Sequence, residues 1–143
     1  MTSNGKPLSD LVTLAFDTHT LVWWLTGHER LTTAQSAAIR RAEARGDRIG
    51  IPAICFWEIA KLVERGRIEL DVPVDELFDE IEDHPSMRLL ELTPRIALES
   101  TRLGPAFPGD PADHLIAATA RVHGLQLVTA DHRIRVSHIV AVI

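Results

Sequence analysis

The sequence is poor in cysteine and has no long apolar run. Its one cysteine, Cys55, excludes a disulfide within the chain, and its apolar neighbours favour a buried free thiol over a catalytic one. A membrane-spanning helix needs roughly 20 consecutive apolar residues, so we expect a soluble protein with no membrane partner. The lack of disulfides agrees with a cytoplasmic location, where thiols stay reduced. Residues 1–10 lack the apolar stretch of a secretory signal, and we expect residues 1–11 to form a flexible tail.

Positive charge is also scarce. The chain has 15 Lys and Arg against 20 Asp and Glu, a formal net charge of −5. Nucleic-acid binding usually relies on surplus cations that displace counterions from phosphates. If the protein acts on RNA, its positive charge must come from bound metal ions and from local arginines, although such arginines more often form a solvated helix face or loop. The arginines concerned are Arg40, Arg41, Arg45, Arg48, Arg133 and Arg135.

Two kinds of active-site motif are missing. The sequence has no glycine-rich phosphate-binding loop of the Walker or dinucleotide form. Its seven histidines include no pair spaced four apart beside a glutamate and no His/Cys cluster, which argues against the common zinc sites. His19 and His132 lie next to acidic residues, where a rim or capping role is the commoner one.

The residues that are present alternate between short apolar runs and longer segments of helical period. This pattern predicts an α/β fold with a parallel sheet of four to five strands, in one domain covering residues 1–143. We expect strands at residues 12–16, 48–51, 88–92, 125–128 and 139–142. We expect helices at 33–46, 52–65, 73–85, 94–104 and 113–123, and a first helix that carries residues 21–25.

Four acidic residues stand out by their position. Asp17 follows the first predicted strand, Asp113 opens the helix before the fourth strand, and Asp131 follows that strand. Glu58 lies inside a helix between two apolar residues, where a neutral side chain would pack at lower cost. In an open parallel sheet, ligands bind outside the carboxyl ends of the strands, so we expect these acids to share one cleft.

Each acid taken alone has a simpler explanation. Asp17 and Asp113 are good helix N-caps, and Asp131 can shape a turn. Glu58 can pair with Lys61 on the helix surface. The functional interpretation therefore depends on whether the four carboxylates lie together in one cleft. Four carboxylates in one cleft repel one another unless cations neutralise them, and oxygen ligands without cysteine suit Mg²⁺ or Mn²⁺. Such ions promote phosphodiester hydrolysis, which is the chemistry that we expect.

The same residues resemble the VapC-type toxins of the PIN-domain family of ribonucleases, which belong to type II toxin–antitoxin systems. The matching blocks occur in the family's order and span about residues 12 to 135. They are Phe16-Asp17-Thr18-His19, Leu21-Val22-Trp23-Trp24-Leu25, Phe56-Trp57-Glu58-Ile59-Ala60-Lys61, Gly109-Asp110-Pro111-Ala112-Asp113-His114, and Leu127-Val128-Thr129-Ala130-Asp131.

The resemblance implies a three-layer α/β/α fold and an endoribonuclease that uses Mg²⁺ or Mn²⁺, leaves a 5′-phosphate and is inhibited by a VapB-like antitoxin. The family's acidic set maps onto Asp17, Glu58, Asp113 and Asp131, with Asp110 as an outer-shell ligand or, in our preferred interpretation, a loop acid. Thr129 either orients a metal-bound water or ends its strand. His19 departs from the Ser or Asn that many PIN domains carry there.

Three further questions stay open at the level of sequence. Trp23 and Trp24 can stack on bases, but packing is the commoner role, and the apolar groups near Trp23 and Phe56 make a homodimer plausible. A phosphatase or phosphotransferase with Asp17 as nucleophile is disfavoured, because no second acid follows closely. The alternative outside the enzymes is a non-catalytic interaction module whose carboxylates bind an arginine of a partner protein.

Overall fold

The computed structural model describes residues 11–143, so residues 1–10 of the predicted tail lie outside the described part. The sheet has four parallel strands in the order β3-β2-β1-β4. The strands are β1 (Val12–Phe16), β2 (Arg48–Pro52), β3 (Met87–Leu90) and β4 (Gln126–Val128). The helices are α1 (Thr18–Thr26), α2 (Thr33–Ala44), α3 (Ile54–Glu64), α4 (Val74–Asp83), α5 (Pro94–Ser100), α6 (Pro111–His123) and α7 (His132–Ser137).

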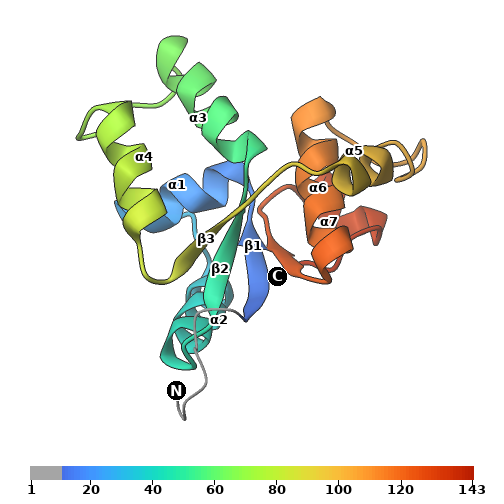
Figure 1. Cartoon of the computed structure of the whole chain (residues 1–143), viewed down its shortest axis with the longest axis horizontal. Coiled ribbons are helices and arrows are strands. Elements are labelled where there is room, and N and C mark those ends of the chain that lie inside the picture. Colours follow the sequence, from blue (N-terminus) through green and yellow to red (C-terminus); the bar gives the residue numbers. More distant parts are fainter. Residues whose placement is uncertain (1–10) are drawn as a thin grey trace.

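Helices cover the sheet on both sides. Figure 1 shows α1 and α4 to the left of the strands, α3 above them, α5, α6 and α7 to the right, and α2 at the lower end. This arrangement confirms the predicted three-layer α/β/α fold. The strands are short and apolar because both of their faces are covered. Phe16, Ile51 and Leu127 have no exposed surface, and Ile59 of α3 and Ile116 of α6 pack into the same core.

The central position of β1 determines where the site lies. Its last residue, Phe16, is in register with Val128 at the end of β4, and the Asp17 N–H donates to the Val128 carbonyl at 3.2 Å. The chain therefore leaves β1 and β4 at the same edge of the sheet. Asp17 and Asp131 follow these two strands, which brings residues more than a hundred apart in sequence to one end of the molecule.

The structure corrects several of the predicted elements. Residues 139–142 do not form a fifth strand, because only one isolated bridge, between Leu127 and Val142, continues the sheet beyond β4. Pro52 ends β2 instead of opening the next helix, which starts at Ile54. The six-residue helix α7 was not predicted at all. Its short length gives no helical period from which to recognise it.

The helices between residues 11 and 143 are all too short or too polar to cross a lipid bilayer.

Candidate functional site

Asp17 ends β1 and caps α1. Its extended backbone (φ −86°, ψ 178°) lets Oδ1 accept a hydrogen bond from the Thr20 N–H at 3.0 Å. The Thr20 hydroxyl lies 2.7 Å both from Asp17 Oδ1 and from the Val128 carbonyl. Thr20 is fully buried, so its hydroxyl links the carboxylate to the ends of β1 and β4. The capping role expected of a lone Asp is real, and it fixes the orientation of this carboxylate.

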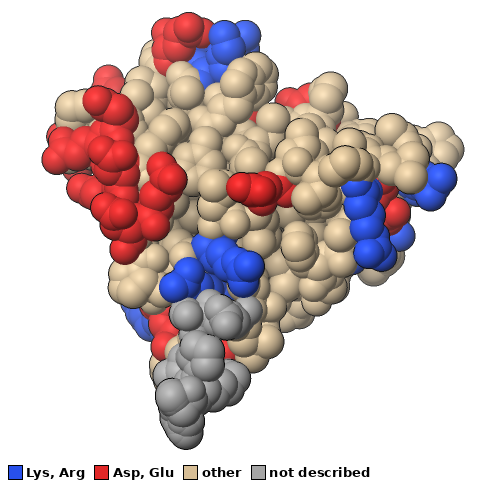
Figure 2. Space-filling model, in the orientation of Figure 1, with Lys and Arg blue, Asp and Glu red and all other residues tan. Residues whose placement is uncertain are grey.

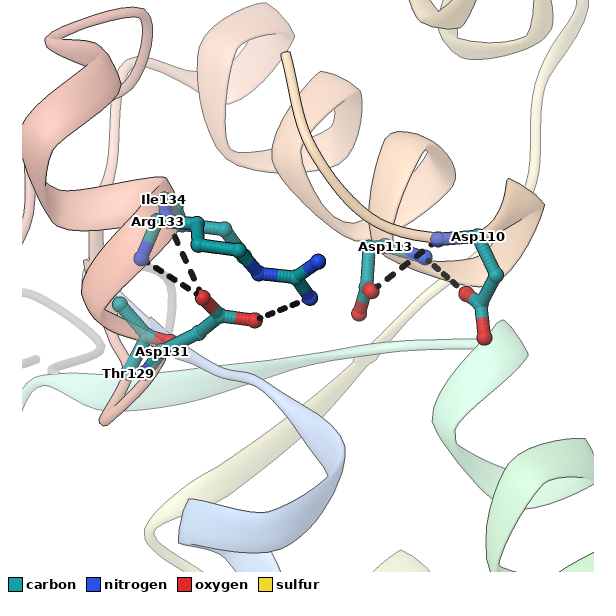
Figure 3. A network of polar contacts seen from close by, with 6 residues as sticks. All are labelled: Asp110, Asp113, Thr129, Asp131, Arg133 and Ile134. Atoms are coloured by element: carbon teal, nitrogen blue, oxygen red, sulfur yellow. Dashed lines mark hydrogen bonds and ion pairs between the residues drawn. The ribbon is translucent and has the colours of Figure 1, made fainter.

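Asp110 and Asp113 hold each other at the start of α6. Asp110 is the N-cap, and its Oδ1 accepts from the Asp113 N–H at 3.1 Å, while Asp113 Oδ2 accepts from the Asp110 N–H at 3.3 Å (Figure 3). The sequence prediction was therefore wrong about where this helix begins, because Asp113 lies in its first turn and Asp110 precedes it. This capping box gives both side chains a defined direction.

Gly109 makes room for this arrangement. Its φ of +95° is a conformation that side-chain-bearing residues rarely adopt. A Cβ at this position would also overlap Asp113, coming within 2.8 Å of its Cβ and closer still to its Oδ2. A glycine is therefore needed here both for the turn and for the placement of the Asp113 carboxylate.

Asp131 follows β4 and caps α7. Its Oδ1 accepts from the N–H groups of Arg133 and Ile134 at 2.9 and 3.3 Å, and its own N–H donates to Thr129 Oγ1 at 3.1 Å. Arg133 Nη2 lies 3.4 Å from Asp131 Oδ2, and Figure 3 shows this guanidinium extending from Asp131 toward Asp113. The hydrogen bond to Thr129 gives that residue a structural role at the end of the strand.

Glu58 reaches the site from α3. Its Oε1 accepts a hydrogen bond from the hydroxyl of Thr18, a buried residue in the first turn of α1. The predicted alternative, a pair with Lys61, is wrong because Lys61 binds Glu64 at 3.0 Å. Burial raises the pKa of Glu58, and the hydrogen bond from Thr18 opposes this effect. A glutamate on an apolar stretch of helix thus has its compensating partner on another element.

The four acids line one cavity of about 350 Å³. Burial, followed by the negative charges of Asp110 and Glu58, raises the pKa of Asp113 to about 6. The predicted convergence is therefore observed. The lining residues are Asp17, Thr18, His19, Trp23, Arg30, Glu58, Asp110, Asp113, Ala130 and Asp131.

A larger cavity, of about 750 Å³, lies beside the loop between α5 and α6. Its lining is mainly apolar, includes His114 and contains no carboxylate. The charged groups are concentrated in the smaller cavity, so we take the smaller one as the functional site.

The donor set of the small cavity fits a hard divalent cation. Hydrogen bonds hold one oxygen each of Asp17, Asp110 and Glu58, and within residues 11–143 no donor occupies the second oxygen of these carboxylates. Cys55 is close in sequence, but its side chain is buried and does not line the cavity, and burial raises the pKa of its thiol. Among the described residues no three acidic, His or Cys side chains stand close enough together to form a preformed metal site.

Sequence reasoning missed several residues of the cavity. Arg30 had no motif to mark it, and Thr18 contacts a residue 40 positions away, which no local pattern reveals. The contact between Thr20 and Asp17 could have been predicted, because a hydroxyl three residues after an N-cap is well placed to donate a hydrogen bond to the capping side chain.

Trp23 packs against His28, with ring centroids 5.9 Å apart, and Arg30 Cζ lies 5.7 Å from the centre of the Trp23 ring. Trp24 packs against the core, which agrees with the packing role expected for tryptophans here.

Comparison with known proteins places these observations in a family. Ribonuclease VapC22 of Mycobacterium tuberculosis is 40% identical over 125 residues, which cover 87% of this chain and 92% of that protein.

Solved structures of low sequence identity share the fold. VapBC2 from Rickettsia felis matches with a TM-score of 0.69 at 14% identity, covering 93% of this chain and 98% of that one. A toxin–antitoxin complex from Klebsiella pneumoniae matches with a TM-score of 0.57 at 21% identity, covering 83% and 87%. Residues 14–137, which include every carboxylate that lines the cavity, match the PIN domain, and the chain belongs to this family.

Proposed function

We propose that this protein is a metal-dependent endoribonuclease that hydrolyses RNA phosphodiester bonds. The observation that carries the proposal is the convergence of four carboxylates from separate elements in one cavity. The relative named Ribonuclease VapC22 supports RNA as the substrate class. Carboxylates crowded in a half-buried cavity raise each other's pKa, and a bound cation removes that penalty.

The proposed ligands are Asp17, Glu58, Asp113 and Asp131, and Mg²⁺ or Mn²⁺ is the proposed cofactor. When bound, such an ion polarises the phosphodiester and lowers the pKa of an attacking water. Backbone amides hold the Asp17 and Asp113 carboxylates at one oxygen and leave the other for the ion. The Thr18 hydroxyl orients Glu58 in the same way. Asp110, the partner of Asp113 in the capping box, serves as an outer-shell group that fixes its neighbour.

The protein is further proposed to be the toxin of a VapBC-type pair in the cytoplasm, with a VapB-like antitoxin as its partner. The structural neighbours described as VapBC2 and as a toxin–antitoxin complex support this assignment. A homodimer is proposed as well, because Leu92, Leu98 and Val136 are large apolar side chains that stay about half exposed. Sedimentation of the purified chain tests the dimer.

The proposed activity is tested by incubating a structured RNA pool with the purified protein and Mg²⁺ or Mn²⁺, beside EDTA controls and the Asp17→Asn variant. We expect cutting that requires metal and is lost in the folded variant. Failure of the folded, metal-loaded and antitoxin-free parent to cut would argue first for a narrow RNA target. If a wide set of RNAs also stayed intact, a non-catalytic interaction module would replace the proposal.

A further inference from the structure

A second hollow adjoins the carboxylate cavity on the side of α3. It has a volume of about 300 Å³ and shares His19, Glu58 and Asp110 with the carboxylate cavity, so the two form one continuous depression. Its other lining residues, which we call the α3 groove, are Trp57, Lys61, Leu62, Arg65 and Arg67. A chain that passes over the carboxylates can therefore continue into the α3 groove.

The end of α3 fixes the backbone that carries the two arginines. The Gly66 N–H donates to the Val63 carbonyl and the Arg67 N–H to the Leu62 carbonyl, at 3.0 and 2.8 Å. Gly66 has a φ of +67°, and this combination is a Schellman motif. Arg65 and Arg67 lie on either side of that glycine, so their backbone positions are set before any ligand arrives.

The charge of the α3 groove contrasts with that of the chain as a whole. The net charge is −5, and Figure 2 shows acidic side chains gathered over α4 at the left. At the top of the same view, around the end of α3 in Figure 1, Lys and Arg side chains lie beside Asp and Glu side chains. Within residues 11–143, neither Arg65 nor Arg67 forms an ion pair, and Lys61 shares its charge with Glu64. Two arginines thus remain available to an anionic ligand.

Trp57 adds an aromatic surface to these cations. Its side chain lies on α3 one residue before Glu58 and is 55% exposed. Lys61 Nζ lies 6.0 Å from the centre of its ring, and no aromatic ring of the described residues stacks on it. An exposed aromatic ring beside cations is the combination that binds single-stranded nucleic acid, through stacking on bases and contacts to phosphates.

We propose that the α3 groove binds the single-stranded RNA next to the bond that is cut. Arg65 and Arg67 contact successive phosphates, and a base stacks on Trp57. This inference rests on the proposed nuclease function and adds the path of the RNA substrate. RNA binding and RNA cutting are measured separately, so that the groove and the nuclease activity can each be refuted without the other.

Binding is measured by fluorescence anisotropy with an end-labelled single-stranded RNA of mixed sequence, in EDTA so that no cutting occurs. We expect the double variant Arg65→Gln/Arg67→Gln to bind at least tenfold more weakly at low salt. The slope of log K against log salt should fall by about 1.4, because each phosphate contact on a single strand contributes about 0.7. Trp57→Ala should weaken binding about tenfold with an unchanged salt slope, and Trp57→Phe should restore most of it.

The matched control is Arg95→Gln/Arg102→Gln, which removes two exposed arginines from α5 and the turn just after it, away from α3 (Figure 1). It changes the net charge equally and should leave the slope unchanged. Equal RNA binding by the parent, the groove variant and the control would overturn the inference, as would a parent that does not bind RNA. Dependence of polyglutamate binding, but not RNA binding, on Arg65 and Arg67 would assign the groove to an acidic protein segment instead.

The cutting assay separates the inference from the proposed function. A parent that cuts RNA with metal, together with a groove variant that binds and cuts equally well, would refute the groove and leave the nuclease standing. A parent that binds RNA through the groove but never cuts it would refute the nuclease alone.

Discussion

Two acidic regions of this protein have similar composition and different surroundings. Helix α4 carries six carboxylates, and all of them are exposed on the outside of the fold: Asp75, Glu76, Asp79, Glu80, Glu82 and Asp83. Four of the carboxylates that line the cavity, Asp17, Glu58, Asp113 and Asp131, come from the ends of β1 and β4, from α3 and from α6. The acids on α4 are neighbours in sequence and face water, whereas those of the cavity are distant in sequence and partly buried.

The comparison shows that the place of a carboxylate in the fold decides its chemistry. Water screens the charges on α4, so their mutual repulsion is small. In the cavity, burial and nearby carboxylates raise the pKa of Asp113 and of Glu58. Crowded and partly desolvated carboxylates attract a cation, while a solvated acidic face serves solubility. The four predictions below test this contrast.

The largest effect is expected from the same substitution made once in each region. Asp113→Asn should reduce metal-dependent RNA cutting at least about 100-fold, because a lost metal contact removes several kcal/mol of transition-state stabilisation. Asp79→Asn on α4 should change cutting less than about twofold. Initial rates at saturating Mg²⁺ or Mn²⁺ measure both effects. Equal losses of RNA cutting in the two variants would show that activity depends on the total negative charge and not on the position of the carboxylate.

A second pair of variants tests how the fold aims Asp113. Gly109→Ala should reduce cutting about tenfold, because the new methyl group overlaps the Asp113 carboxylate. Gly104→Ala is the matched control, since Gly104 has a similar φ of +93° and an added methyl would meet no atom within 4 Å. Both variants lose roughly 1 to 2 kcal/mol of stability from the same backbone strain. Thermal unfolding measures that loss, and equal cutting by the two variants would contradict the predicted role of Gly109.

A third, smaller effect is expected at Thr18. Thr18→Val removes the hydrogen bond to Glu58, which raises the pKa of that carboxyl further and weakens its hold on a cation. A hydrogen bond of about 1 kcal/mol predicts roughly fivefold weaker activation by metal, seen as a higher Mg²⁺ concentration at half-maximal rate. Thr18→Ser keeps the hydroxyl and should behave like the parent. An unchanged metal requirement in Thr18→Val would mean that Glu58 is oriented by other contacts.

The smallest effect concerns stability without metal. The folded-state pKa of Asp113 is about 6, against an ordinary value of 3.8, so the folded protein binds a proton more readily than the unfolded chain between these values. Stability should therefore rise as the pH falls from 7 to 5, by an amount on the order of 1 kcal/mol because the group is partly solvated.

Thermal unfolding in EDTA at several pH values measures this effect. The parent should gain about 3 °C over that range relative to Asp113→Asn. The variant Asp79→Asn should follow the parent. If the thermal stability of the parent and of Asp113→Asn changed identically with pH, the pKa of Asp113 would not be raised in the folded state.

Most of the secondary structure was predictable because its signals are local. The first strand was predicted with the bounds that the structure shows for β1. The helix expected to begin at residue 33 is α2, whose N-cap Thr32 forms a capping box with Gln35. Errors occurred where the local signal was weak or ambiguous. Pro52 suits both a strand end and a helix start, and the apolar residues near Ile139 lie beside β4 without forming a strand of their own.

Part of the cavity was also predictable, because an Asp that directly follows a buried parallel strand lies at the carboxyl edge of the sheet. The sequence by itself determined that Asp17, Asp113 and Asp131 lie near the carboxyl ends of strands, since apolar runs, caps and glycine stops act within one or two turns of chain. Only the tertiary structure decided that Glu58 meets Thr18, that Asp110 caps the helix of Asp113, and that the α3 groove adjoins the carboxylates. These contacts join residues of different elements, and packing of those elements on one sheet brings them together, which no local pattern encodes.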